Sequence, residues 1–332
     1  MGSAPQYRRR GDRRRAGRWR RATLAALITG AVVVPLSGAV RPQTPAPAPA
    51  HLAALSASTL DDAYAANRAN AAEAARTAAV HHDRDRAATD RRLAAPARHL
   101  LRFDGRGSGR VTEVLGDLAR ADRVAVLVPG SDTSLDTYGR FHAAAAALHR
   151  QLGRQAPAGT RTAVVAWLGY ETPGTVSTTV TTTGRAEQAV PQLRALVTDL
   201  RAITGAGPRI SLLCHSYGSV VCGRAAAGLA VDDIALVGSP GTGADTAAGL
   251  HTRARVWAAR GGDDWVENVP HVDVDLFGTT VGFGTDPVSP AFGARVFTAG
   301  DGGHSDYFRP GSASLTNLAR IVLGETKAVT HD

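Results

Sequence analysis

The segment Ile210-Ser-Leu-Leu-Cys-His-Ser-Tyr-Gly-Ser219 decides the fold that we expect for this chain. Its apolar first half predicts a strand over Ile210–Cys214, and the small residues after it predict a helix over Ser219–Gly228. Between the two, Ser216 stands in the pattern x-H-S-x-G. A sharp turn from strand to helix lifts a serine hydroxyl clear of the sheet, as a nucleophile requires. The alternative is that Ser216 is an ordinary helix N-cap.

On both sides of this turn, apolar strand-like runs alternate with helical segments. The further predicted strands are Leu100–Asp104, Arg110–Leu115, Val124–Val128, Ala163–Leu168, Ile234–Val237, Arg255–Ala259 and Arg295–Thr298. The further predicted helices are Tyr138–Arg150, Ala186–Thr204 and Ser314–Leu323. Strands that alternate with helices predict an α/β fold, with a mostly parallel twisted sheet and helices on both of its faces.

A nucleophilic serine needs a base and an acid that orients the base. With this kind of turn, their order along the chain is serine, acid, histidine. His304 follows the last predicted strand, in the loop where the base belongs. The run R-G-G-D-D-W follows the strand before it and carries two carboxylates, Asp263 and Asp264. The spacing from Gly261 favours Asp264 as the acid, and Asp263 remains the alternative.

Two backbone N–H groups must stabilise the oxyanion that forms during acyl transfer. The amide of Tyr217, which follows the nucleophile, is the first candidate. The second is the amide of Ser131, in the loop after a predicted strand, where Gly130 permits an unusual backbone conformation. We interpret His215 as a packing residue, because the turn points it away from the reacting atoms. This chemistry needs no metal and no cofactor.

The chain has two cysteines, Cys214 and Cys222, which are too few for a disulfide scaffold or a cysteine zinc cluster. They can pair with each other only if their Cα atoms lie within about 7 Å. The sequence leaves that question open.

Six segments, in order, resemble one bacterial family. They are V-P-G at 128–130, A-W-L-G-Y at 166–170, H-S-Y-G-S at 215–219, V-G-S-P-G at 237–241, D-P-V-S-P-A-F-G-A-R at 286–295 and G-H-S-D-Y-F at 303–308. The family is an α/β-hydrolase family described as a domain of unknown function, found mainly in exported or envelope proteins of high-GC bacteria. The resemblance covers about residues 100–325.

This resemblance implies an α/β-hydrolase fold in which Ser216 is the nucleophile, His304 the base and Asp264 the acid. It implies no particular substrate. The chain departs from the family at Cys214, where glycine is more usual. Cysteine is small and commonly buried, so the turn can accept it.

The formal net charge of +9 is concentrated at the N-terminus. Residues 1–50 hold ten arginines and one acid, whereas residues 51–332 hold equal numbers of basic and acidic side chains. A basic groove of the kind that binds nucleic acid is therefore not expected.

The first 58 residues have the composition of a targeting segment and a linker rather than of a folded domain. An Arg-rich stretch precedes 19 uncharged residues, 22–40, which predict either a secretory signal peptide or a membrane anchor. Small residues allow cleavage after Ala39, and Ala50 is a second candidate. The predicted organisation is an n-region (1–21), a signal or anchor that contacts the membrane if uncleaved (22–40), a Pro/Ala linker (41–58), a long Ala-rich helix (59–96) and a hydrolase domain (100–325).

These features together predict an exported or membrane-anchored serine hydrolase of the cell envelope. Its domain would lie outside the cytoplasm and cleave a small or exposed ester, in the manner of a carboxylesterase. An acyltransferase or amidase would use the same three side chains. A non-catalytic envelope protein that keeps the fold for binding is the alternative from another class.

Overall fold

A computed structural model describes residues 45–174, 183–269 and 283–331. It also describes the backbone, without the side chains, of residues 274–276 and 279–281. The predicted signal or anchor at 22–40 lies outside these ranges. Among the helices that are described, none is both long and apolar enough to cross a membrane.

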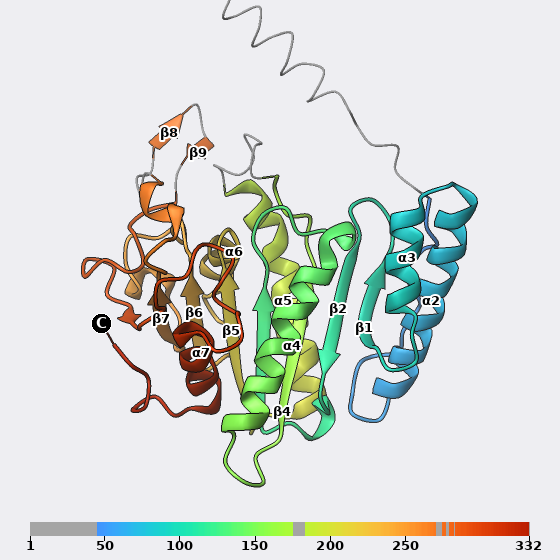
Figure 1. The fold of residues 1–332 in the computed structure, drawn as a ribbon, viewed down its shortest axis with the longest axis horizontal. Helices are drawn as coiled ribbons and strands as arrows, with labels where there is room; N and C mark the ends of the chain where they lie inside the picture. The colour runs from blue at the N-terminus through green and yellow to red at the C-terminus, as the bar shows by residue number, and fades with distance from the viewer. Residues whose placement is uncertain (1–44, 175–182, 270–273, 277–278, 282, 332) are drawn as a thin grey trace, which may run out of the picture. The chain divides into compact units, whose positions relative to one another are not determined.

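An eight-stranded sheet forms the centre of the described structure, in the order β1-β2-β4-β3-β5-β6-β7-β10 (Figure 1). The strands β1 and β2 pair antiparallel, as do β2 and β4, and all other neighbours are parallel. This arrangement confirms the predicted mostly parallel sheet. The bounds are β1 His99–Asp104, β2 Arg110–Leu115, β3 Arg123–Val128, β4 Thr162–Leu168, β5 Arg209–His215, β6 Asp233–Val237, β7 Arg255–Ala259 and β10 Arg295–Val296.

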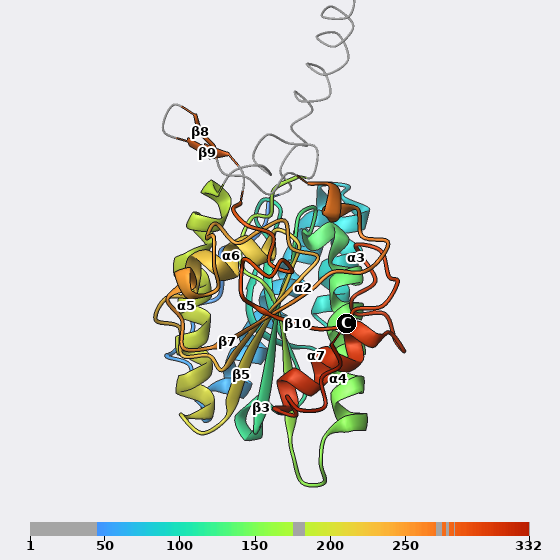
Figure 2. The same cartoon turned by 90° about the vertical axis from the view of Figure 1, so that its left-hand side faces the viewer.

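Helices cover both faces of this sheet, as expected. Figure 2 shows α4 and α7 on one side of it and α5 and α6 on the other. Each side has its own apolar cluster, because side chains alternate between the two faces of a strand. The bounds are α4 Tyr138–Gln155, α5 Gly184–Thr204, α6 Gly218–Ala225 and α7 Ala313–Leu323. The predicted ends were wrong by up to five residues: α4 is longer than expected, and α6 is shorter.

The single long helix predicted over 59–96 is wrong. The chain forms two helices, α2 Leu60–Val80 and α3 Arg84–Leu93. They are separated by His82, whose backbone is left-handed with a φ of 62°. Asp83 then caps α3 by accepting a hydrogen bond from the amide of Arg86 at 3.1 Å. Neither glycine nor proline marks this break, so the composition of the segment did not reveal it.

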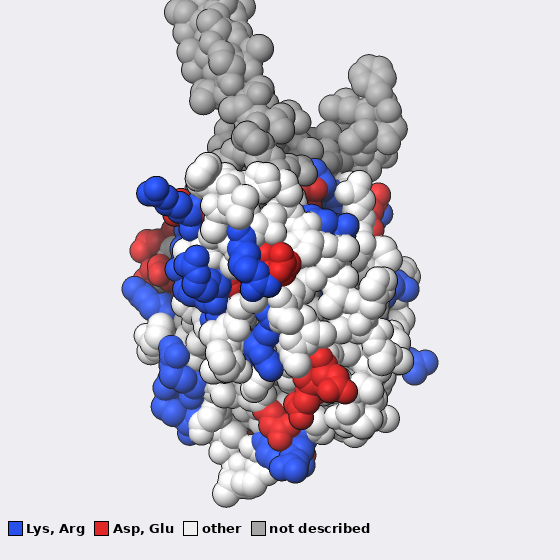
Figure 3. All heavy atoms as spheres, turned by 90° about the vertical axis from the view of Figure 1, so that its right-hand side faces the viewer, with Lys and Arg blue, Asp and Glu red and all other residues white. Residues whose placement is uncertain are grey.

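The α2–α3 hairpin, residues 60–93, lies against the β1 edge of the sheet (Figure 1). The buried amide of Asn67 donates to the carbonyl oxygens of Leu100 and Leu101, both at 3.0 Å. On the side of the molecule that the hairpin covers, basic and acidic side chains are interspersed (Figure 3). An ion pair also joins Arg102 in β1 to Asp199 in α5. The hairpin is therefore a layer of the domain, packed against the edge of the sheet.

Short elements complete the described chain. Four 3-10 helices are η1 Leu118–Arg120, η2 Leu135–Thr137, η4 Ala248–Leu250 and η5 Trp265–Asn268. The strands β8 Val274–Leu276 and β9 Thr279–Val281 pair antiparallel and were not predicted.

Candidate active site

The turn that carries Ser216 connects β5 to α6, as the sequence predicts. Ser216 has a φ of 54°, a left-handed conformation that few non-glycine residues adopt. Gly218 allows α6 to start close to β3, because a Cβ at this position would lie 2.6 Å from the carbonyl oxygen of Val128. The amide of Ser216 donates to the carbonyl of Val237 in β6 at 3.0 Å. A strained backbone held in this way is typical of functional sites.

Three side chains form one hydrogen-bonded chain at this turn. The Nε2 atom of His304 lies 2.9 Å from Ser216 Oγ, and its Nδ1 atom lies 2.8 Å from Asp264 Oδ1. Asp264 follows β7 and His304 follows β10, so both lie where parallel strands end beside β5 and β6. Of the two candidate acids, Asp264 is buried and contacts the imidazole, whereas Asp263 is exposed. The structure thus brings the three predicted residues together, and their catalytic roles stay a prediction.

Asp264 is held as a carboxylate although only 2% of it is exposed. Burial on its own raises the pKa of this carboxyl, but hydrogen bonds from His304 and Tyr307 lower it below its usual value. The amide of Val266 donates to Oδ1 at 2.9 Å, and the Tyr307 hydroxyl donates to Oδ2. An ionised Asp264 can fix the imidazole so that Nε2 accepts the serine proton.

His215 connects the serine turn to the loop of His304. Its Nε2 atom donates to the backbone carbonyl of His304 at 2.7 Å, and the two rings lie 4.8 Å apart. Burial, helped by the neighbouring His304, lowers the pKa of His215 to about 4. This imidazole is therefore neutral at neutral pH. The sequence indicated packing for His215, and its hydrogen bond to the His304 loop was not foreseen.

The loop after β3, residues 129–134, lies directly against Ser216. A Cβ at Gly130 would lie 2.6 Å from the Cβ of Ser216, so only glycine fits this approach. Ser131 and Tyr217, the two predicted oxyanion residues, line the same cavity as Ser216. The buried Tyr217 hydroxyl accepts a hydrogen bond from the amide of Ala186 at 3.1 Å, which holds this residue in place. The oxyanion roles of both amides stay a prediction.

A cavity of about 680 Å³ opens beside Ser216. Its apolar walls come from both clusters that flank the sheet, since Leu127, Leu213 and Tyr307 belong to one and Val128, Tyr217 and Phe283 to the other. Several lining residues were not predicted, namely Phe141, Phe308, Arg140 and Trp265.

Trp265 and its neighbours form one rim of the cavity. The indole of Trp265 is 52% exposed and lies 4.6 Å from the His304 ring. Val266, Val269 and Phe283 also line the cavity. The position of Trp265 next to Asp264 in the sequence was the signal that could have identified it.

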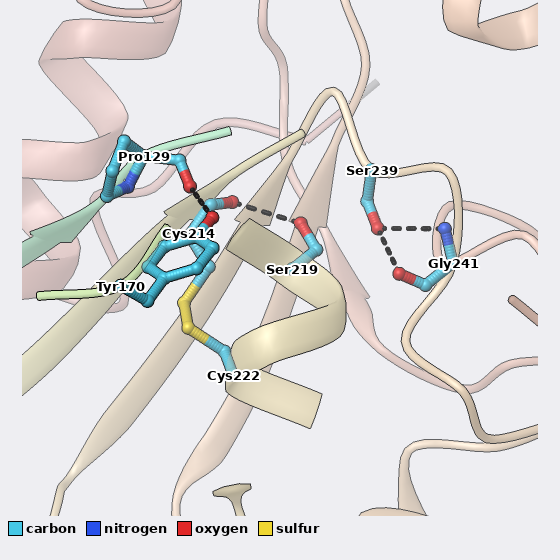
Figure 4. Close-up of a disulfide and its surroundings, with 7 residues drawn as sticks. All are labelled: Pro129, Tyr170, Cys214, Ser219, Cys222, Ser239 and Gly241. Atoms are coloured by element: carbon cyan, nitrogen blue, oxygen red, sulfur yellow. Dashed lines mark hydrogen bonds between the residues drawn. A yellow bond between two sulfur atoms is a disulfide. The ribbon is translucent and has the colours of Figure 1, made fainter. Parts of the chain in front are cut away.

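Cys214 and Cys222 form a disulfide that joins the end of β5 to α6, with their Cα atoms 6.4 Å apart (Figure 4). Both residues are fully buried. The hydroxyl of Ser219 also donates to the carbonyl of Cys214 at 3.1 Å. The structure therefore answers the question of pairing, and the strand and helix on either side of Ser216 are covalently connected.

Within the described ranges, no group of three or more His, Cys, Asp or Glu side chains could hold a metal ion. The site contains a serine within hydrogen-bond distance of a histidine that also contacts a buried carboxylate, a second, neutral histidine and an apolar cavity. Such an arrangement can perform nucleophilic attack on a carbonyl carbon.

Comparison with known families bears on this geometry. A family model described as alpha/beta hydrolase matches residues 104–274, which is more than half of the chain. The chain belongs to the alpha/beta hydrolase family. The matched range includes Ser216 and Asp264 and ends before His304. The family assignment confirms the predicted fold and indicates a hydrolase.

This alpha/beta hydrolase is similar to an uncharacterized protein of Mycobacterium tuberculosis, found in strains CDC 1551 and H37Rv. The identity is 31% over 261 residues, covering 68% of this chain and 39% of the relative. The chain thus spans about two fifths of the length of these relatives.

Two solved structures are similar to parts of the described fold. A serine hydrolase without a lid from Xanthomonas campestris, XC6422, is 16% identical with a TM-score of 0.41, over 66% of this chain and 88% of its own. The esterase LipW from Mycobacterium marinum is 16% identical with a TM-score of 0.38, over 76% of this chain and 89% of its own.

Proposed function

We propose that this alpha/beta hydrolase is a serine hydrolase that cleaves a small or exposed ester through an acyl-enzyme, as a carboxylesterase does. The observation that carries the proposal is the hydrogen-bonded chain from Ser216 through His304 to Asp264, which opens on an apolar cavity. A serine that only capped a helix would need neither the imidazole nor the buried carboxylate.

The reaction proceeds in two steps. In the first, His304 Nε2 takes the proton of Ser216 Oγ while that oxygen attacks the ester carbonyl. The tetrahedral intermediate collapses when the same imidazole gives its proton to the leaving alcohol, which leaves an acyl-serine. In the second step His304 removes a proton from water, the resulting hydroxide attacks the acyl-serine, and Ser216 recovers its proton as the acid leaves.

Other groups stabilise the charges that develop in both steps. The Ser131 and Tyr217 amides donate to the oxyanion. Asp264 holds the Nδ1–H tautomer of His304 and stabilises the imidazolium that forms. Its own ionisation is secured by the hydrogen bonds that lower its pKa.

The shape of the site favours a small or exposed substrate. The connection between β6 and β7, residues 238–254, contains one short 3-10 helix and no inserted domain. The walls of the cavity are mainly apolar, so an acyl group of moderate size can be buried in it.

The test is labelling of the full chain with a fluorophosphonate probe, which reacts only with an activated serine. We expect the wild type to be labelled and Ser216→Ala to be unlabelled. The matched control is Ser219→Ala, in the first turn of α6, because the Ser219 hydroxyl donates to the Cys214 carbonyl. If folded wild-type protein does not react with the probe, the proposal is wrong, and the alternative of a non-catalytic binding protein is favoured.

We also propose that the domain acts outside the cytoplasm, with residues 22–40 serving as a signal peptide or an anchor. The Cys214–Cys222 disulfide supports this location, because disulfides persist in oxidising compartments. Mass spectrometry of the protein from its producing cell tests the proposal. A chain that begins at residue 40 or at residue 51 indicates a cleaved signal, and an intact chain in the membrane fraction indicates an anchor. An intact chain in the cytosol would contradict both.

A further inference from the structure

The α2–α3 hairpin, residues 60–93, precedes the range that matches the family and takes no part in the proposed chemistry. It nevertheless contacts η2, the short helix that ends the 129–134 loop. That loop carries Ser131, the proposed oxyanion donor, and approaches Ser216 closely through Gly130. The hairpin therefore lies one element away from the reacting atoms.

Arg86 of α3 makes the polar part of this contact. Its side chain is 7% exposed, and its Nε atom donates to the carboxylate of Asp136 in η2 at 2.9 Å. Its two terminal nitrogens donate to the carbonyl oxygens of Gly105 and Gly107, at 2.9 and 3.1 Å. One guanidinium thus holds together α3, the β1–β2 turn and η2. Only arginine offers donors in this rigid forked arrangement.

Leu135, also in η2, makes the apolar part of the contact. It is fully buried in a cluster with Leu93 of α3 and with Ala71 and Ala74 of α2. The cluster also contains Leu100 and Phe103 of β1. Leu135, which directly follows the 129–134 loop, is therefore packed between the hairpin and the β1 edge of the sheet.

Hydrogen bonds also join η2 to the 129–134 loop. The Thr137 hydroxyl donates to the carbonyl of Asp132 and accepts from the amide of Ser134, both at 2.9 Å. The amide of Asp132 donates to the carbonyl of Pro173 at 3.0 Å. Asp132 is left-handed, with a φ of 57°. Ser131 is thus held between two fixed neighbours. Gly130 lies against Ser216, and the left-handed backbone of Asp132 is held by the hydrogen bond from Thr137 of η2.

We propose that the α2–α3 hairpin positions the oxyanion loop of this enzyme through Arg86, and so forms a working part of the active site. This inference rests on the proposed function, since it requires Ser131 to donate to the oxyanion. An oxyanion donor lowers the barrier only if it is held in place before the charge develops. Arg86 is a positioning residue in this account, because it acts through η2 and the loop and touches no substrate.

The experiment compares two arginines of the hairpin in the full chain. Arg86→Gln removes the contact with η2. Arg68→Gln is the matched control, because Arg68 donates to the carbonyl of Arg98 at 3.0 Å and no bond joins it to residues 129–137 among the described residues. The saturation kinetics of fluorophosphonate labelling give a maximal rate and an apparent affinity for each variant. Hydrogen exchange of the peptide 129–137 reports on the loop directly.

We expect Arg86→Gln to lower the maximal labelling rate about ten- to hundred-fold with little change in affinity, because a small misplacement of a catalytic group costs this much. Exchange in 129–137 should become faster in the same variant. Arg68→Gln should stay within about twofold of the wild type in both respects. Arg86→Lys, which restores the charge without the fork, should recover only part of the rate.

The outcomes separate the inference from the function on which it rests. If the wild type is labelled and a folded Arg86→Gln is labelled equally fast, the inference is wrong and the proposed function stands. If both glutamine variants lose the same fraction of the rate, the hairpin only stabilises the domain and the inference is again wrong. If the wild type is not labelled at all, the proposed function fails, and this inference fails with it.

Discussion

Tyr307 donates its phenolic hydrogen to the carboxylate oxygen of Asp264 that His304 does not use. The same hydroxyl accepts a hydrogen bond from the amide of Gly261 at 3.0 Å. Burial and the hydrogen bond to Asp264 both raise the pKa of Tyr307, so the phenol keeps its proton. Tyr307 lies only three residues after His304, and the two side chains therefore hold one carboxylate from the same loop.

Tyr307→Phe should lower kcat about tenfold and leave KM nearly unchanged. A hydrogen bond to a charged group contributes about 1.5–3 kcal/mol, and without it Asp264 orients His304 less firmly. The measurement is steady-state hydrolysis of 4-nitrophenyl butyrate at a temperature where both proteins are folded.

Tyr64→Phe is the control for this substitution. Tyr64 is also a buried tyrosine, but among the described residues its hydroxyl has no hydrogen-bond partner. Removal of this hydroxyl should lower neither kcat nor the melting temperature. Equal kcat values for Tyr307→Phe and the wild type would show that Asp264 does not depend on the phenol.

Gly130→Ala should reduce the rate of fluorophosphonate labelling at least a hundred-fold. The added Cβ would lie 2.6 Å from the Cβ of Ser216, so either Ser216 or the 129–134 loop must move. Gly139→Ala is the matched control, because nothing lies within 4 Å of a Cβ at that position in α4. That variant should keep its labelling rate and gain about 0.5–1 kcal/mol of stability. Similar rates for both variants would contradict the proposed closeness of loop and nucleophile.

Cys222→Ala should lower the free energy of unfolding by about 2–4 kcal/mol, because it removes the cross-link that closes a short loop around Ser216. Cys214→Ala combined with Cys222→Ala should cost little more, since the first substitution already breaks the bond. Thermal unfolding with and without dithiothreitol measures the effect. Melting temperatures that do not respond to the reductant in the wild type would argue against the bond.

Asp90→Asn should stabilise the protein, and the gain should be larger at pH 8 than at pH 5. Asp90 is 1% exposed, and burial raises its pKa to about 7, with Asp136 and Asp83 adding to the effect and Arg86 opposing it. A carboxyl whose pKa is raised on folding contributes stability in full below about pH 4, the range of the unfolded chain, and loses it as the pH rises through about 7.

The expected difference at pH 8 is about 2–4 kcal/mol in favour of the variant, measured by urea unfolding at both pH values. Comparison at the two pH values cancels the contributions of other groups. Asp264, for example, has a lowered pKa and loses its contribution only in strong acid. Equal stability differences at pH 5 and pH 8 would mean that Asp90 is ionised throughout this range.

Local patterns carried most of the information on the elements and their order. Short apolar runs between helical segments were enough to identify the eight strands of the main sheet, because a strand buried on both faces must be apolar along its length. The turn around Ser216 could also be recognised in the sequence. Its small residues are required by close packing among ten consecutive residues, 210–219. The break at His82 could not be recognised in this way, because it depends on the cap by Asp83 and on docking against β1.

The sequence alone determined the α/β class, the serine turn and the order of serine, acid and histidine, because each follows from residues that are close together or from chain order. Only the tertiary structure decided which of two adjacent aspartates meets His304, that Cys214 and Cys222 pair, and that Tyr307 and His215 support the site. It also placed the α2–α3 hairpin against η2, the short helix that follows the 129–134 loop. These relationships join side chains that the folded sheet brings together, and no local pattern encodes such distances.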